Sequence, residues 1–257
     1  MDTVEKKKEE KFRGVRIVPE IDQEWTVERI VKERVPKGWE EVFKEAMPEL
    51  QDISDILNEQ EREYGTYYPL KRDLFRAFEL TPAQKVKVVM LGQDPYPQTL
   101  LSGLPRATGL SFSVRRDDEI PSSLKNIYKE LEGSIEGFKA PCHGDLTEWA
   151  YQGVFLLNMC LTVIPGKPGS HKELWLGFIV KVLAYLAEIR PRCIYVLLGL
   201  EAQKVQKYLG ERSIVFTSSH PSGRSADKGF LGSKIFRKVN QQLIKQGETP
   251  IKWQLSD

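Results

Sequence analysis

Residues 86–91 read VKVVML, an apolar run typical of a buried strand, and residues 92–96, which follow directly, read GQDPY. Similar apolar runs occur at residues 154–157 (VFLL), 193–198 (CIYVLL) and 213–217 (SIVFT). Helical patterns lie between or after these runs, at residues 122–132, 145–152, 173–188, 201–209 and 233–245. Continuous apolar strands that alternate with helices indicate a parallel sheet covered on both faces. The sequence therefore predicts an α/β fold, a three-layer α/β/α sandwich around a central four-stranded, mostly parallel sheet.

The chain before this α/β region divides into two parts. Residues 38–64 carry apolar side chains at the spacing of amphipathic helices, with Pro48 marking a break between them. Residues 1–35 are rich in Lys, Glu and Arg, a composition typical of a solvated tail. We expect a charged, partly disordered N-terminal extension over residues 1–37, with its docking on the domain left open, and one folded domain over residues 38–257.

The composition limits the class of protein. The 257 residues, 40% of them hydrophobic, suffice for one substantial core. The formal net charge is only +2, so any nucleic-acid surface must come from local clustering of basic residues. Three widely spaced cysteines argue against a disulfide framework and a paired-cysteine metal site. No signal peptide or membrane span is visible, and we expect a soluble, intracellular monomer, with nucleus and cytoplasm both open.

Polar residues follow each of the four apolar runs. Ligands of open parallel sheets bind beyond the carboxyl ends of the strands, so these residues should converge on one pocket. They are Gln93, Asp94 and Tyr96 after the first run, Asn158 after the second, Gly199 after the third, and Ser218, Ser219 and His220 after the fourth. A carboxylate, an amide and an imidazole together suit hydrolysis through a cationic, oxocarbenium-like transition state.

Other chemistries have no matching motif. The sequence has no histidine cluster at metal-ligand spacing, no glycine-rich phosphate loop that opens a helix and no nucleophile elbow, so we expect no metal and no other cofactor. His143 beside Asp145 could be a catalytic pair, but Asp-Leu-Thr-Glu is also a helix start with a carboxylate cap. We favour the structural interpretation, and His171 is likewise interpreted as a loop or cap residue.

Seven short motifs stand along the domain, at residues 92–96 (GQDPY), 109–114 (GLSFSV), 122–131 (SSLKNIYKEL), 143–146 (HGDL), 156–163 (LLNMCLTV), 220–222 (HPS) and 249–253 (TPIKW). In this order and spacing, from about residue 38 to the C-terminus, the chain resembles the family-1 uracil-DNA glycosylases. The resemblance implies a DNA repair hydrolase that flips uracil out of single- or double-stranded DNA. It would cleave the N-glycosidic bond, release free uracil and leave an abasic site.

The resemblance also implies roles for single residues. Asp94 would position the attacking water and stabilise the sugar cation, and His220 would donate to O2 of the departing uracil. The uracil-binding residues would be Gln93, which lines the pocket, Tyr96, which blocks a C5 methyl group, Phe112, which stacks on the base, and Asn158, which reads the base edge. Small loops would hold the DNA backbone. The matching positions are Ser122, Ser123, Gly199, Ser222, Arg224 and Ser225.

Some positions depart from the family pattern. Pro97 stands where a histidine is usual, and residues 97–108 form a longer segment in which Arg106 could substitute for that histidine. Gly223 and Arg224 replace a proline and the leucine that enters the base stack. The planar guanidinium of Arg224 could fill the same gap. These departures indicate a divergent member, with a virus as one candidate source.

Two other functions stay open. A non-catalytic DNA-binding or replication-accessory protein on the same scaffold would bind DNA whether or not it holds uracil. Pro97 and the altered loop after His220 are the departures that support this alternative. A glycosylase for another lesion, such as mispaired thymine, conflicts with Tyr96, which should exclude a C5 methyl group. The sequence leaves protein partners and the role of the N-terminal extension open.

Overall fold

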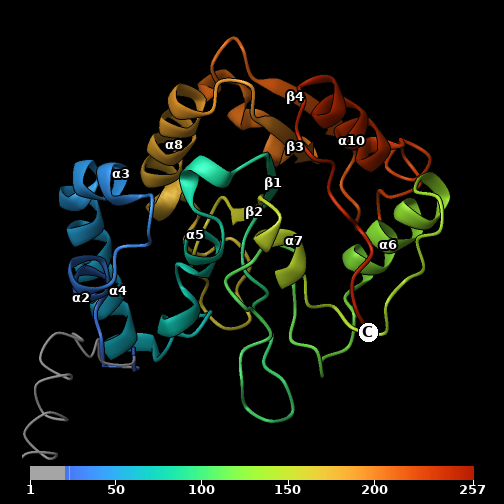
Figure 1. Cartoon of the computed structure of the whole chain (residues 1–257). Helices are drawn as coiled ribbons and strands as arrows, with labels where there is room; N and C mark the ends of the chain where they lie inside the picture. Colours follow the sequence, from blue (N-terminus) through green and yellow to red (C-terminus); the bar gives the residue numbers. More distant parts are fainter. Residues whose placement is uncertain (1–20, 23) are drawn as a thin grey trace, which may run out of the picture.

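A four-stranded parallel sheet forms the centre of the protein, as the computed structural model of residues 21–22 and 24–257 shows (Figure 1). The strands are β1 (Val88–Gly92), β2 (Val154–Asn158), β3 (Ile194–Leu198) and β4 (Ile214–Ser218), in the order β2-β1-β3-β4. Every neighbouring pair is parallel. The predicted fold class is confirmed, with an entirely parallel sheet, and each predicted strand lies within two residues of the observed one.

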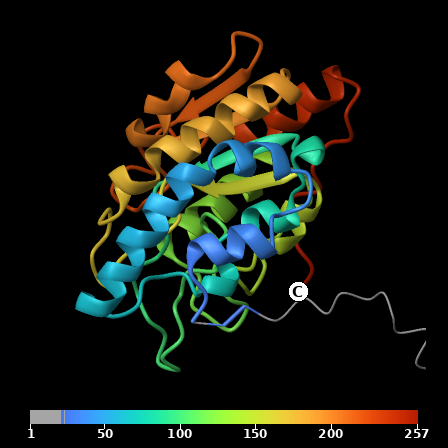
Figure 2. The ribbon, with the colours of Figure 1, turned by 90° about the vertical axis from the view of Figure 1, so that its left-hand side faces the viewer.

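Helices cover both faces of the sheet. They are α2 (Val27–Glu33), α3 (Glu40–Glu45), α4 (Met47–Tyr64), α5 (Arg76–Leu80), α6 (Ser122–Ser134), α7 (Thr147–Tyr151), α8 (Lys172–Ile189), α9 (Leu200–Gln203) and α10 (Ile235–Lys245). Short 3-10 turns are η1 (Lys71–Asp73), η2 (Ala83–Lys85) and η3 (Lys204–Tyr208). Figure 1 places α3, α4 and α8 on one side of the sheet and α6 and α10 on the other. Figure 2 shows α4 and α8 lying side by side over the first face.

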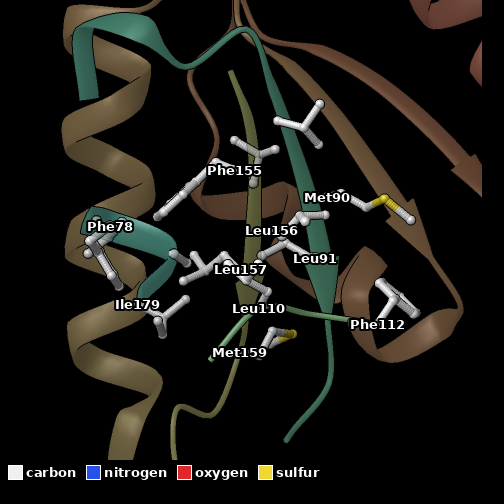
Figure 3. Packing of buried hydrophobic residues seen from close by; sticks show 14 of the residues in the cluster. Phe78, Met90, Leu91, Leu110, Phe112, Phe155, Leu156, Leu157, Met159 and Ile179 are labelled. Carbon is white, nitrogen blue, oxygen red and sulfur yellow. The ribbon is translucent and has the colours of Figure 1, made fainter. Parts of the chain in front are cut away.

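The core explains why β1, β2 and β3 read as continuous apolar runs. Every residue of β1, of β3 and of the edge strand β2 is buried, whereas the other edge strand, β4, is only partly covered. On the α8 side, Phe155 packs against Phe78 with ring centroids 5.1 Å apart and against Trp39 at 4.8 Å. Figure 3 shows Phe155 and Leu157 directed toward Phe78 and Ile179. This packing holds the carboxyl ends of the strands in fixed positions.

The first described residues belong to this core. Trp25, Val27, Ile30 and Val31 are buried, and α2 packs on α4. Thr26 caps α2, since its hydroxyl accepts a hydrogen bond from the Arg29 amide at 3.1 Å. Part of the segment expected as an extension is therefore built into the domain, whose packing starts before residue 38. Residues 1–20, on which the expectation of disorder mainly falls, lie outside the described residues.

Two helices differ from their predicted extent. The pattern over residues 201–209 predicts one helix, but the structure has α9 followed by the 3-10 turn η3. The pattern over residues 145–152 gives only the five residues of α7, because Asp145 turns the chain before the helix, accepting a hydrogen bond from the Thr147 amide at 3.0 Å. Among the described residues no helix is long and apolar enough to span a membrane.

Candidate functional site

A pocket of about 180 Å³ lies at the carboxyl ends of β1 and β2. Seven of the residues predicted from the sequence line it, namely Gln93, Asp94, Tyr96, Phe112, Ser123, Asn158 and His220. They come from the ends of three strands, from the loop that carries Phe112 and from the start of α6, as expected for a ligand site of a parallel sheet. Asp94 and His220, separated by more than a hundred residues of sequence, face the same cavity.

The Asp94 carboxylate is held by a backbone amide from a distant loop. Its Oδ2 accepts a hydrogen bond from the Gly169 amide at 2.7 Å. Burial raises the pKa of Asp94 above its usual range, and the Gly169 hydrogen bond opposes that shift. The second carboxylate oxygen makes no hydrogen bond within the part of the chain that the structure describes. It is therefore available to a ligand or to water.

The His220 imidazole is fixed in one tautomer. Its Nδ1 accepts a hydrogen bond from the Ser222 amide at 3.0 Å, so in the neutral ring Nε2 carries the proton. Burial lowers the pKa of His220, which keeps the ring neutral at physiological pH. Gly199 permits this position, because a Cβ there would lie 2.9 Å from the His220 Cβ. The ring is thus a neutral hydrogen-bond donor.

Two aromatic residues form another wall of the pocket. Phe112 has a positive φ of 64°, which is rare for a bulky residue and indicates a functional constraint. Its carbonyl oxygen accepts a hydrogen bond from the Tyr96 hydroxyl at 3.3 Å. Burial raises the pKa of Tyr96, so the phenol stays protonated. Figure 3 shows Phe112 on the opposite side of β1 from Phe78, and its ring centroid lies 6.3 Å from that of His220.

Asn158 is the last residue of β2, and it lines the pocket. The residue is 6% exposed, and its side chain forms no hydrogen bond with any residue in the ranges 21–22 and 24–257. A buried amide without a protein partner is costly unless a ligand satisfies it. It can donate through Nδ2 and accept through Oδ1, so it suits a ligand edge that offers the reverse pair.

Gly92 makes room for that amide. A Cβ at this position would lie 2.3 Å from Asn158 Oδ1 and 2.8 Å from the Ser111 Cβ. We expect Gly92→Ala to displace Asn158, to lower kcat/KM for the pocket's ligand about tenfold or more and to destabilise the fold by about 1–3 kcal/mol. Steady-state kinetics and thermal melting measure the two effects. A Gly133→Ala control in α6, where a Cβ meets nothing within 4 Å, should leave kcat/KM unchanged and should not lower the Tm, since alanine favours a helix over glycine.

The residues expected to contact DNA surround the mouth of the pocket. A second hollow is lined by Gln93, Ser122, His220, Ser222, Gly223 and Arg224, and a third contains Gly199 and Ser225. Ser225 donates to the His220 carbonyl at 2.8 Å and lies 3.0 Å from the Ser222 hydroxyl. These bonds shape the loop after β4, whereas the exposed Arg224 side chain projects from it.

Two residues that position the site were not predicted from the sequence. Gly169 holds Asp94, and only the Pro-Gly pair at residues 168–169 hinted at a loop that could approach it. Asn126 of α6 donates to the Pro221 carbonyl at 2.8 Å and so ties the His220 loop to the opposite side of the site. Neither residue stands in a pattern that predicts these contacts.

Other candidate residues lie outside the pocket. Asp145 accepts from the Thr147 amide at 3.0 Å, and His143 Nδ1 accepts from the Asp145 amide at 3.1 Å, so both have structural contacts in the turn before α7. Asp145 is not the helix cap expected from the sequence, because the N-cap residue of α7 is Leu146. His171 is buried, with Nδ1 2.8 Å from the Thr162 hydroxyl.

Arg106 is paired with Asp118 and is not among the residues that line the pocket. Its Nη2 donates to Asp118 Oδ1 at 2.8 Å, and its Nε lies 2.8 Å from Oδ2 of the same buried carboxylate. It supports the base of residues 97–108, a loop that extends below the sheet in Figure 1. Pro97 lines the pocket but offers no side-chain donor.

Comparisons with known proteins agree with one another. A family model described as the uracil DNA glycosylase superfamily matches residues 78–244. A uracil-DNA glycosylase of Pasteurella multocida is 42% identical over 224 residues, covering 86% of this chain and 99% of that protein. One from Yersinia pestis is 45% identical over 220 residues, covering 84% and 94%. The crystal structure of mimivirus uracil-DNA glycosylase superposes with a TM-score of 0.81 at 31% identity, covering 85% of this chain and 86% of that one.

These matches include the whole pocket, because the family model spans every lining residue from Gly92 to His220. The similarity to the mimivirus protein agrees with the expected viral-like divergence. Proteins of this family remove uracil from DNA by hydrolysing the glycosidic bond, the first step of base excision repair. The chain belongs to the uracil-DNA glycosylase superfamily.

Proposed function

We propose that uracil excision takes place in the pocket at the ends of β1 and β2, with Asp94 and His220 as its catalytic residues. The observation that carries this proposal is that Asp94, Asn158 and His220 line one cavity of about 180 Å³. Such a cavity cannot hold a base that is still stacked in a duplex, so the nucleotide must be extruded first.

Asn158, Tyr96, Phe112 and Gln93 select the base. The Asn158 amide donates to O4 of uracil and accepts from its N3–H, whereas cytosine presents the inverted pair and would leave buried groups unpaired. The Tyr96 ring, held by its bond to the Phe112 carbonyl, blocks the C5 position against a methyl group. Phe112 stacks on the base, and Gln93 lines the pocket mouth.

Asp94 and His220 act on opposite ends of the scissile bond. As the bond between C1′ and N1 breaks, its electron pair passes to uracil, and the sugar develops positive charge. The neutral His220 ring donates from Nε2 to O2 of the uracil anion, and a donor aimed at developing charge contributes about 3–4 kcal/mol. The Asp94 carboxylate stabilises the cation and orients the water that attacks C1′, whose proton it can accept.

The rim of the pocket grips the DNA backbone. Serine hydroxyls and backbone amides would bind the phosphates beside the lesion, while Arg224 fills the vacated place in the base stack. The residues concerned are Ser122, Ser123, Gly199, Ser222, Arg224 and Ser225. One chain supplies every residue of the pocket, which supports action as a monomer.

One assay tests the proposal against its rivals. The full chain is incubated with oligonucleotides that carry uracil, a thymine mismatch or no lesion, and free base is measured. We expect release from the uracil substrate alone. A protein that binds all three equally and releases nothing is a DNA-binding scaffold, and release of thymine would contradict the role of Tyr96.

The pH dependence follows from the two catalytic groups. Asp94 must be ionised, and its pKa is raised above 3.8, while His220 must keep Nδ1 unprotonated, and its pKa is lowered below 6.5. We expect kcat/KM to be constant around neutral pH and to fall on acidification, with half-loss above pH 3.8, because the raised pKa of Asp94 lies above that value. A profile measured with circular dichroism at each pH separates this loss from unfolding. Full activity persisting below pH 3.8 would contradict the assignment of Asp94.

A further inference from the structure

The loop that carries Gly169 is closed at its neck by two buried side chains. Thr162 stands just before the loop and His171 at its end, and the Thr162 hydroxyl lies 2.8 Å from His171 Nδ1. Thr162 is fully buried, and His171 is only 2% exposed. Between them, the Gly169 amide donates to the Asp94 carboxylate at 2.7 Å. The loop therefore reaches the catalytic group through its backbone, while its neck lies behind the pocket lining.

The neck is anchored to the helix that follows it. The Trp175 indole of α8 donates to the Thr162 hydroxyl at 2.7 Å, and an indole N–H can only donate. The hydroxyl therefore directs its own proton to Nδ1 of His171. Burial lowers the pKa of His171 to about 4, so the ring is neutral and Nδ1 can accept. Its Nε2 forms no hydrogen bond with residues 21–22 and 24–257, so within these ranges the ring is held through Nδ1.

The bonds within the loop make Gly169 dependent on this neck. The Ile164 amide donates to the Ser170 hydroxyl at 2.9 Å, which joins the two ends of the loop a second time. The Lys172 amide donates to the Gly169 carbonyl at 3.2 Å, so Gly169 and His171 belong to the same turn. A shift of the His171 ring should therefore displace Gly169.

We propose that His171 is a positioning residue for uracil excision, which acts on Asp94 through the Gly169 loop without lining the pocket. This inference rests on the proposed function, since Asp94 is the group that the loop holds. The Gly169 hydrogen bond lowers the pKa of Asp94 against the effect of burial. Loss of this bond should therefore raise that pKa further, and it should leave the carboxylate less well directed at the sugar.

Other ionisable groups around Asp94 have different supports. Burial raises the pKa of the Cys160 thiol to about 12 and that of the Tyr96 phenol further, so both stay protonated on the acid side. His220 can titrate there, but its Nδ1 is held by the Ser222 amide rather than by the Gly169 loop. A change at the neck should therefore alter the acid side of the pH profile through Asp94.

The test measures single-turnover uracil release by the full chain as a function of pH. We expect His171→Leu, which removes the Nδ1 acceptor, to lower the rate at neutral pH about tenfold and to move the half-loss on acidification to higher pH. Thr162→Val, which replaces the hydroxyl with a methyl group, should do the same. His171→Asn offers an amide oxygen near the position of Nδ1, so it should restore the original profile and keep the rate within about threefold.

A double variant shows whether His171 acts through Asp94. In the Asp94→Asn chain, His171→Leu should have little further effect on the rate, because the group that the loop holds no longer carries a charge or accepts a proton. His143→Leu is the matched control, since His143 is 3% exposed and lies in the turn before α7, outside the pocket lining. It should lower the Tm and leave the pH profile unchanged.

The outcomes separate this inference from the proposed function. If the half-loss stays at its original pH in His171→Leu and Thr162→Val, or if the loss of rate persists in full in the Asp94→Asn chain, His171 supports the fold and does not position Asp94. If the unaltered chain releases no uracil, the proposed function is wrong and the inference is overturned with it.

Discussion

Replacing Asp94 with asparagine is expected to lower the rate of uracil release about a thousandfold. Asparagine has the same shape and can still accept the Gly169 hydrogen bond of 2.7 Å, so the pocket keeps its geometry. It carries no negative charge, however, and neither stabilises the sugar cation nor accepts a proton from water. Single-turnover release of uracil measures the chemical step, and DNA affinity should stay within about tenfold of the original.

The same variant should be at least as stable as the original chain. Burial raises the pKa of Asp94, so the folded state holds the proton more tightly than the unfolded state. The ionised form therefore costs stability at any pH above that pKa, and asparagine removes the cost. We expect an equal or higher Tm at neutral pH. Loss of activity together with a clearly lower Tm would indicate that Asp94 is structural.

A matched Asp→Asn change gives the opposite pattern. Asp145 lies outside the pocket and accepts hydrogen bonds from the Thr147 amide at 3.0 Å and the Thr147 hydroxyl at 2.6 Å. Asp145→Asn should leave uracil release unchanged and lower the stability by about 1 kcal/mol. If the Asp145→Asn variant lost activity, the hypothesis that His143 and Asp145 form a catalytic pair would be supported instead.

Replacing Asn158 with aspartate is expected to have a comparably large effect on base choice. A carboxylate cannot donate to O4 of uracil, and its charge repels that oxygen in a buried site. Two hydrogen bonds are lost or reversed, so we expect kcat/KM for uracil to fall about a thousandfold. The cytosine amino group can donate to the new carboxylate, so release of cytosine should become measurable. Competing uracil and cytosine oligonucleotides report both changes.

A structural asparagine provides the control for this change. Asn240 donates to the Ile251 carbonyl and accepts from the Ile251 amide, both at 2.9 Å, far from the pocket lining. Asn240→Asp loses one donor and should lower the Tm without altering base choice. If Asn158→Asp keeps its preference for uracil, another group reads the base edge.

The sheet and most of the pocket could be predicted because their signals are local. Each strand coincides with a short, mostly apolar run, and Asp94, Asn158 and His220 stand within two residues of a strand end. The rule that ligands bind at the carboxyl edge then brings them together. The ordered motifs added the particular chemistry, which the apolar pattern alone leaves open.

The suggestion that Arg106 could substitute for the missing histidine gains no support from the structure, for a tertiary reason. Its sequence position near Tyr96 suggested proximity to the pocket, but Asp118, twelve residues later, binds its guanidinium. Similarly, the charged composition of the sequence before residue 38 gave no sign that Trp25 and its neighbours are buried. Their few apolar side chains form one face of α2, and only contact with α4 buries them.

By itself the sequence determined the four-stranded α/β architecture and the identity of the main pocket residues, because apolar periodicity and short motifs depend on neighbours along the chain. Only the tertiary structure decided that Gly169, 75 residues away, holds Asp94, that His220 is a donor through Nε2, and that Thr162 and His171 close the loop that carries Gly169. These features depend on the distances and directions between segments that meet only after folding. No local pattern of residues encodes them.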